Sequence, residues 1–203
     1  MTAPLDPEDA RRSAERYGPL TESLRRLVDT VIRSDAGHDE VRRAHALIDE
    51  AADLLGTNLH PDQYPLRVTT EGRTLTWGNV AIGLRNAIAP PLKPRRDETG
   101  RVTTDLVLGA AYEGPVGHVH GGVCALVLDH ILGATAHRPG SQAFTGTLTI
   151  RYVAPTPLGA LRAEAWVDRD EGSKTFALGR ITDARGTVTV EAEGIFIRPK
   201  KRP

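Results

Sequence analysis

The sequence predicts an α+β fold in which an antiparallel sheet wraps around one long apolar helix, with a helical extension in front of it. Residues 117–133 carry few polar side chains, so a helix there has no polar face for water and must be enclosed by other structure. After this segment the chain consists mostly of strand-like stretches separated by short turns. A sheet that wraps the helix is the simplest way to hide its apolar surface.

Residues 1–60 are predicted to form the helical extension, and residues 61–203 the main domain. Asp6-Pro7-Glu8-Asp9 is typical of a helix start, because proline is tolerated in the first turn. Thr21 is predicted to cap one helix, and Asp39 a second helix that ends at Gly56. Apolar side chains at i, i+3 and i+4 spacing form a stripe along each helix. The two stripes are Leu24, Leu27, Val28 and Val31, and Val41, Ala44, Ile48, Ala51 and Leu55.

Short strands and loops are predicted between the extension and the apolar helix. Prolines at positions 90 and 91 favour a loop over residues 86–92, and the charged residues 93–100 are typical of a turn. Strands are expected over residues 64–70, 73–77 and 102–112.

Four further strands are predicted after the apolar helix, over residues 145–152, 161–167, 174–182 and 187–198. The turns between them are expected at residues 155–159, 168–173 and 183–186. Short turns favour antiparallel pairing of strands that follow one another.

Composition narrows the class of protein. The 203 residues contain 26 basic and 26 acidic side chains, which argues against nucleic acid or an anionic membrane surface as the main partner. Cys124 is the single cysteine, so no internal disulfide can form, and a reducing cytoplasm is expected. The acidic start does not resemble a secretory signal, and no apolar run approaches the ~20 residues of a membrane span.

Two polar features in the apolar segment suggest an active site. Asp129 lies in the middle of the predicted helix, where an isolated carboxylate is costly and is normally partnered, protonated or functional. His120 and Gly121 lie at the helix start, where backbone N–H groups suit a developing oxyanion. Asp129 also remains open to a purely structural interpretation, as a carboxylate that pairs with a neighbour in the core.

The segment Gly114-Pro115-Val116-Gly117-His118-Val119-His120-Gly121-Gly122, followed by Asp129 nine residues after His120, resembles the PaaI-like acyl-CoA thioesterases of the hotdog fold. The family places a threonine or serine at the start of the next strand, which corresponds to Thr145. The phrase Tyr152-Val153-Ala154-Pro155-Thr156-Pro157 also resembles the family's proline loop. The resemblance covers roughly residues 75–198 and implies an acyl-CoA hydrolase of lipid metabolism.

The spacing of the two polar features predicts a dimer. Gly121 and Asp129 are separated by about 12 Å along a helix that rises 1.5 Å per residue, whereas catalytic contacts need about 3 Å. One thioester carbonyl therefore cannot touch both groups of the same helix. Two antiparallel copies about a two-fold axis would bring Gly121 of one chain opposite Asp129 of the other. The resemblance implies the same obligate homodimer, and a tetramer built from two such dimers is left open.

In this hypothesis Asp129 acts as general base on water or as a nucleophile through an anhydride, and the N–H group of Gly121 stabilises the oxyanion. Thr145 would orient Asp129 or the water, and His120 would hold the helix entry or the thioester carbonyl. Contacts with the substrate are expected from Gly122, Arg151 and Lys174, the last two because coenzyme A carries phosphates. No cofactor is expected, because coenzyme A is part of the substrate.

Other functions are weighed against this one. A metal site from His118, His120 and His130 is disfavoured, because His130 lies about 14 Å along the helix from the others. Cys124 is disfavoured as a nucleophile, because a cysteine buried in an apolar helix is usually inert. A non-catalytic hotdog module that binds acyl-CoA or a protein, and a dehydratase built on the same fold, remain the alternatives.

Overall fold

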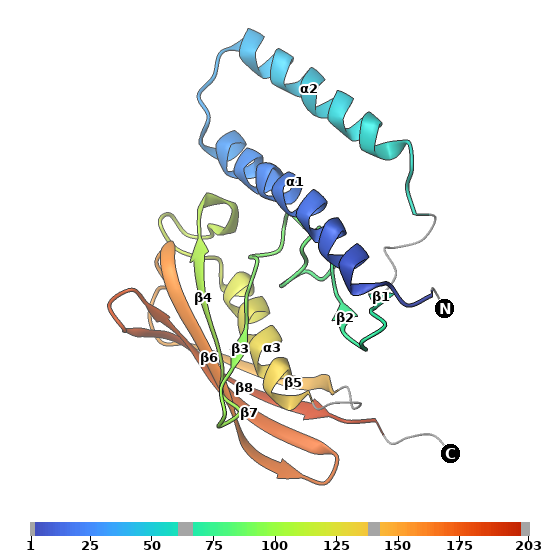
Figure 1. Cartoon of the computed structure of the whole chain (residues 1–203). Coiled ribbons are helices and arrows are strands. Elements are labelled where there is room, and N and C mark those ends of the chain that lie inside the picture. Colours follow the sequence, from blue (N-terminus) through green and yellow to red (C-terminus); the bar gives the residue numbers. More distant parts are fainter. Residues whose placement is uncertain (1–2, 61–66, 138–142, 200–203) are drawn as a thin grey trace. The chain divides into compact units, whose positions relative to one another are not determined.

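The computed structural model describes residues 3–60, 67–137 and 143–199 (Figure 1). The chain forms two compact units, Met1–Gly78 with Leu84–Ala87, and Asn79–Gly83 with Ile88–Pro203. Contacts between residues define these two units and do not show which segment folds independently. The predicted domain boundary between residues 60 and 61 therefore stays a prediction. No helix among the described residues combines the length and the apolar character that crossing a membrane requires.

The first unit begins with α1, Pro7–Arg33, whose start is as predicted. The Asp6 side chain accepts a hydrogen bond from the N–H group of Glu8 at 2.8 Å, and Pro7 occupies the first turn. The prediction that Thr21 caps a new helix is wrong. Thr21 lies buried inside α1, and its hydroxyl donates to the carbonyl of Tyr17 at 2.9 Å. A threonine hydroxyl inside a helix can donate to the carbonyl four residues earlier, so a threonine alone does not mark a helix start.

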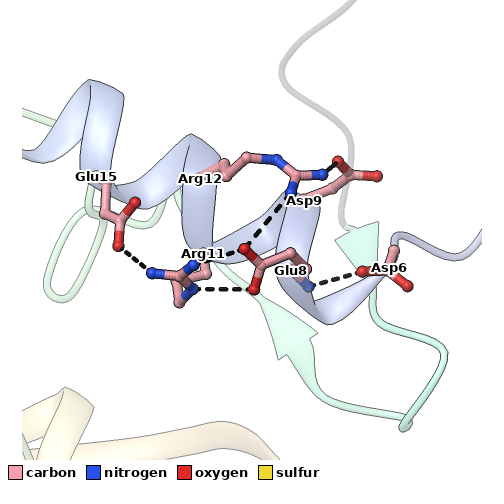
Figure 2. Close-up of polar contacts among 6 residues, drawn as sticks. All are labelled: Asp6, Glu8, Asp9, Arg11, Arg12 and Glu15. Atoms are coloured by element: carbon pink, nitrogen blue, oxygen red, sulfur yellow. Dashed lines mark hydrogen bonds and ion pairs between the residues drawn. The ribbon is translucent and has the colours of Figure 1, made fainter.

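The exposed first turns of α1 carry acids and arginines that pair with one another (Figure 2). Arg11 lies between two acids and donates to Glu8 at 3.0 Å and to Glu15 at 2.6 Å, while Arg12 pairs with Asp9. The hydrogen bond from Arg11 holds the pKa of the Glu8 carboxyl below its usual value. Such exposed pairs at i, i+3 and i+4 spacing support a helix only weakly, because water and salt screen them.

Helix α2, His38–Gly56, ends at the predicted glycine. Its N-cap is Gly37 rather than Asp39, which lies in the first turn, where a carboxylate interacts favourably with the helix dipole. No residue of α2 is buried. Strands β1 (Arg67–Val68) and β2 (Thr74–Leu75) form a hairpin, as predicted from residue 67 onward. Residues 64–66 of the predicted strand lie outside the described residues.

The second unit contains a six-stranded antiparallel sheet with the order β3-β4-β6-β7-β8-β5, and α3 packs against five of its strands (Figure 1). This arrangement confirms the predicted α+β class. The strands are β3 (Arg95–Arg96), β4 (Val102–Leu108), β5 (Phe144–Tyr152), β6 (Gly159–Glu171), β7 (Lys174–Asp183) and β8 (Val188–Ile197).

Three strand boundaries differ from the predictions. Residues 95 and 96, expected in a turn, pair with β4 at the edge of the sheet. Strand β4 is shorter than predicted, because Ala110–Tyr112 form a 3-10 helix. Strand β6 continues through the expected turn at 168–173 to Glu171, and its exposed charged residues extend beyond the core.

The pairing of the strands after the helix also differs from the prediction. Strand β5 pairs with β8 rather than with β6, which follows it in the chain, and β6 lies between β4 and β7. Residues 153–158 therefore connect separate parts of the sheet instead of forming a hairpin. As a result β5 is an edge strand, and its outer N–H and C=O groups are unpaired within the sheet.

Helix α3, Gly121–Ala136, is the predicted apolar helix, although it begins at residue 121 with His120 as its N-cap. Val127, Leu128, Ile131 and Leu132 are fully buried against the sheet. The facing strand residues include Ala163, Ala177, Ile181, Val190 and Phe196, all at most 1% exposed. Burial of each such large side chain contributes about 1.5–3 kcal/mol to folding, which fixes α3 and the polar residues on it.

Candidate active site

Asp129 lies on α3 and is half-buried rather than isolated in the core. The Thr145 hydroxyl, at the start of β5, donates to Oδ1 of Asp129 at 2.9 Å. The structure therefore brings together the acid and the threonine that the sequence singled out. A carboxylate held by one hydroxyl and still reached by solvent keeps a free oxygen, which can accept a proton from water.

A bulge in β5 turns Thr145 toward Asp129. Thr145 pairs with Phe196 and Thr147 pairs with Ile195, so Gly146 is an extra residue without a partner. Strict alternation places Thr145 on the face opposite to Leu148, and the extra residue reverses this. A Cβ atom at Gly146 would lie 2.8 Å from Cδ1 of Ile197 and 3.3 Å from the carbonyl oxygen of Ile195, so glycine suits this site.

The second polar centre surrounds the start of α3. Nδ1 of His120 accepts a hydrogen bond from the N–H group of Gly122 at 3.0 Å. Because Nδ1 is an acceptor, the neutral imidazole carries its hydrogen on Nε2. The N–H group of Gly121 has no acceptor among the described residues, as expected for the first residue of a helix. It is therefore free to bind an oxyanion, whereas the N–H group of Gly122 is already bonded.

Tyr152, which sequence reasoning did not assign to the site, contacts Gly121. Its hydroxyl donates to the carbonyl of Gly121 at 2.9 Å. A Cβ atom at Gly121 would lie 3.0–3.2 Å from three atoms of the phenol, so the space left by the missing side chain is occupied by Tyr152. The alternation of Leu148, Ile150 and Tyr152 in β5 placed this ring on the helix side and was the available signal.

A cavity of about 600 Å³ adjoins Gly121. Among the described residues that line it there is no Asp, Glu, Lys or Arg. Cys124 contributes its thiol, 3.8 Å from the hydroxyl of Thr156, and burial raises the pKa of this thiol. The lining residues are Pro115, His118, Val119, Gly121, Cys124, Tyr152, Val153, Ala154, Pro155 and Thr156.

The two polar centres are separate within one chain. Both Gly121 and Asp129 belong to α3, so the rise of the helix sets them about 12 Å apart, as the sequence indicated. Asp129 and Thr145 form one half of the candidate site, and His120, Gly121 and Gly122 with Tyr152 form the other.

The two predicted basic contacts lie elsewhere. Arg151 is on the sheet face opposite to α3, where its Nε donates to Glu191 at 3.0 Å. It lines a second cavity of about 460 Å³ together with Trp166 and Arg180. Lys174 is exposed at the start of β7. Neither lines the cavity beside Gly121, so contacts of these residues with substrate stay predictions. The described residues include no group of three His, Cys, Asp or Glu side chains placed to hold a metal ion.

Comparison with known proteins bears on the family. The model of the thioesterase superfamily matches residues 116–190, from the helix entry into β8. The crystal structure of protein RHA08564, a thioesterase superfamily protein, is 33% identical, with a TM-score of 0.79 over 89% of this chain and 94% of that one. This chain belongs to the thioesterase superfamily. The predicted resemblance to hotdog thioesterases is thereby confirmed.

Two further proteins extend the comparison. Acyl-coenzyme A thioesterase THEM4 of Xenopus laevis is 34% identical over 92 residues, which are 44% of this chain and 41% of the relative. The chain thus matches about two fifths of that curated relative's length. The BH2602 protein of Bacillus halodurans, solved with CoA, is 22% identical over 83% of this chain and 99% of its own, with a TM-score of 0.53, and shares the fold.

Proposed function

We propose that this protein is an acyl-CoA thioester hydrolase that acts as a homodimer, with each active site shared between the two chains. One observation carries the proposal: the two halves of the candidate site lie at opposite ends of the same edge strand. Thr145, beside Asp129, is near the start of β5, and Tyr152, beside Gly121, is its last residue.

An edge strand can pair with a second copy of itself. If β5 pairs antiparallel with β5 of the partner about a two-fold axis near Leu148, the first residues of one strand lie opposite the last residues of the other. Asp129 and Thr145 of one chain then face the partner's Gly121 and Tyr152. This pairing brings together the two groups that α3 holds apart in one chain, and it produces two equivalent sites.

The proposed reaction uses each group for one task. The N–H group of Gly121 and the Nε2–H group of His120 donate to the thioester carbonyl oxygen, whose negative charge grows as the carbon is attacked. As general base, Asp129 takes a proton from the attacking water, and the C–S bond breaks to release the acid and the CoA thiol. As nucleophile, Asp129 instead attacks the carbonyl carbon and displaces the CoA thiolate, which forms an anhydride, and water then hydrolyses the anhydride to the free acid and the Asp129 carboxylate. Thr145 orients the carboxylate in both variants.

The cavity beside Gly121 is proposed to hold the acyl group, because the described residues that line it include no Asp, Glu, Lys or Arg, which suits an apolar chain better than a phosphate. The phosphates of CoA then lie outside it, where Arg151 and Lys174 remain the candidates. Two similar proteins support this substrate class: THEM4 is named an acyl-coenzyme A thioesterase, and the structure of BH2602 was solved with CoA. The proposal includes a cytoplasmic location, because a single cysteine cannot form an internal disulfide and suits a reducing compartment.

Release of free thiol from a panel of acyl-CoA substrates tests the activity. Asp129→Asn should lower kcat by about 100-fold or more, because loss of a general base typically costs 10²–10⁴. Asp168→Asn changes an exposed acid of β6 and should leave kcat unchanged. Sedimentation of both variants should show the wild-type dimer, or a tetramer if dimers pair further.

Two results would contradict the proposal: wild-type rates in Asp129→Asn, or full activity in a monomer. Loss of water from a 3-hydroxyacyl-CoA without thiol release would favour the dehydratase alternative. Tight binding of acyl-CoA without turnover would favour a binding module.

A further inference from the structure

A continuous chain of hydrogen bonds links the end of β5 to the imidazole at the start of α3. The Tyr152 hydroxyl donates to the carbonyl oxygen of Gly121 at 2.9 Å. That carbonyl belongs to the same peptide group as the N–H of Gly122, which donates to Nδ1 of His120 at 3.0 Å. The order is therefore phenol, peptide group, imidazole.

Such a chain has a direction. A hydrogen bond donated to a peptide carbonyl polarises the peptide group and makes its N–H a better donor, so successive bonds strengthen one another. The hydrogen bond from Tyr152 thus strengthens the bond from Gly122 to Nδ1 of His120. A stronger donor at Nδ1 favours the imidazole that carries its hydrogen on Nε2.

The phenol also restricts where Gly121 can lie. The hydroxyl oxygen and two ring carbons of Tyr152 would lie 3.0–3.2 Å from a Cβ atom at Gly121. Tyr152 lines the same cavity as Gly121, so the ring lies beside the space proposed for the acyl group. The first residue of α3 is consequently held by β5 on one side and by the His120 cap on the other.

We propose that Tyr152 is a positioning residue for His120: through the peptide group between Gly121 and Gly122, it keeps His120 in the tautomer whose Nε2–H can donate to a thioester carbonyl. This inference rests on the proposed hydrolase function and adds a residue that acts through another rather than on the substrate. Tyr152 is absent from the Gly-Gly motif and reaches it from 31 residues away.

A double-mutant cycle tests the proposal through activity. Tyr152→Phe removes one hydroxyl and should lower kcat about 2-fold, a fraction of one net hydrogen bond, with little change in KM, because Tyr152 acts only by strengthening the bond from Gly122 to His120. His120→Asn keeps a side chain that can cap the helix but lacks the Nε2–H group. Adding Tyr152→Phe to His120→Asn should have no further effect on kcat, because Tyr152 acts through His120. Equal losses from Tyr152→Phe in both backgrounds would overturn the proposal.

Tyr112→Phe is the matched control. The Tyr112 hydroxyl also donates to a main-chain carbonyl, that of Ile88 at 3.3 Å. The main-chain carbonyl of Tyr112 accepts from the N–H group of His120 at 2.9 Å, and this bond is kept when only the hydroxyl is removed. This variant should keep the wild-type kcat.

Nitrogen NMR of labelled histidine gives a readout that needs no turnover. In the wild-type protein near neutral pH, Nε2 of His120 should be protonated and Nδ1 should be an acceptor. In Tyr152→Phe, the population with hydrogen on Nδ1 should rise and the amide signal of Gly122 should move upfield. A wild-type His120 with its hydrogen on Nδ1 would refute the positioning role. Absence of thiol release by the wild type would instead refute the proposed function.

Discussion

Replacing Thr145 by valine tests the half of the site that contains the acid. Valine has nearly the same shape as threonine, so the change removes the hydroxyl that donates to Asp129 at 2.9 Å and little else. A hydrogen bond to a charged group contributes about 1.5–3 kcal/mol when it is shielded from water. Thr145 is exposed and Asp129 is half-buried in the chain, so water can replace part of the hydrogen bond. The loss of transition-state stabilisation should therefore be about 1–1.5 kcal/mol. That loss corresponds to a fall in kcat of about 5- to 12-fold.

The assay is thiol release over a range of acyl-CoA concentrations, which separates kcat from KM. Thr149→Val is the control, because Thr149 lies on the same strand with its side chain on the sheet face opposite to α3. Thermal unfolding of both variants should match the wild type within a few degrees. A Thr145→Val enzyme with wild-type kcat would show that the hydroxyl has no part in orienting Asp129.

Three further variants test other parts of the structure. Gly146→Ala should lower both the melting temperature and kcat, because the new Cβ atom would lie 3.3 Å from the main-chain carbonyl oxygen of Ile195, which cannot turn away as the side chain of Ile197 can. Unchanged kcat in a less stable protein would count against the role of the bulge. Hydrogen bonding from the backbone of Thr187 holds the pKa of Asp183 below its usual value. The contribution of the Asp183 carboxylate to the free energy of unfolding should therefore be complete at neutral pH and should fade as the pH drops below about 4. Denaturant titrations of the wild type and of Asp183→Asn should then converge in acid. Cys124→Ala should retain most of the wild-type kcat, because burial raises the pKa of this thiol; complete inactivation in a folded protein would point to a covalent thioester mechanism.

Local patterns were enough to predict much of the fold. The apolar segment became α3, and alternation located the strands of the sheet to within a few residues, because both depend on neighbouring side chains. The pairing of β5 with β8 was missed, since it depends on which strand covers which part of α3, and that is a property of distant contacts. Thr21 was misassigned because the sequence does not distinguish a threonine that donates to a carbonyl within its own helix from one that caps a helix.

The candidate site was predicted only in part, because some of its contacts depend on residues distant in the sequence. The contact between Asp129 and Thr145 followed from the family's motif, but simple alternation puts Thr145 on the wrong face. Only the unpaired residue Gly146 resolves this conflict, and a glycine in a strand is not by itself a marker of a bulge. Alternation in β5 put Tyr152 on the helix side, but its contact with Gly121 was missed because the partner is a main-chain carbonyl, which any residue supplies.

The number of residues in β5 has a consequence for engineering and for natural variation. Thr145 and Tyr152 must both point to the α3 side, and each added or deleted residue between them exchanges the two faces of the remaining strand. A single insertion between Thr147 and Ile150 would therefore turn one of these contacts outward, even with every residue of the site still present. Insertions after Val153 would leave the two faces of β5 unchanged, but they would displace the loop that lines the cavity beside Gly121, where the N–H group of Val119 donates to the carbonyl of Thr156 at 2.9 Å.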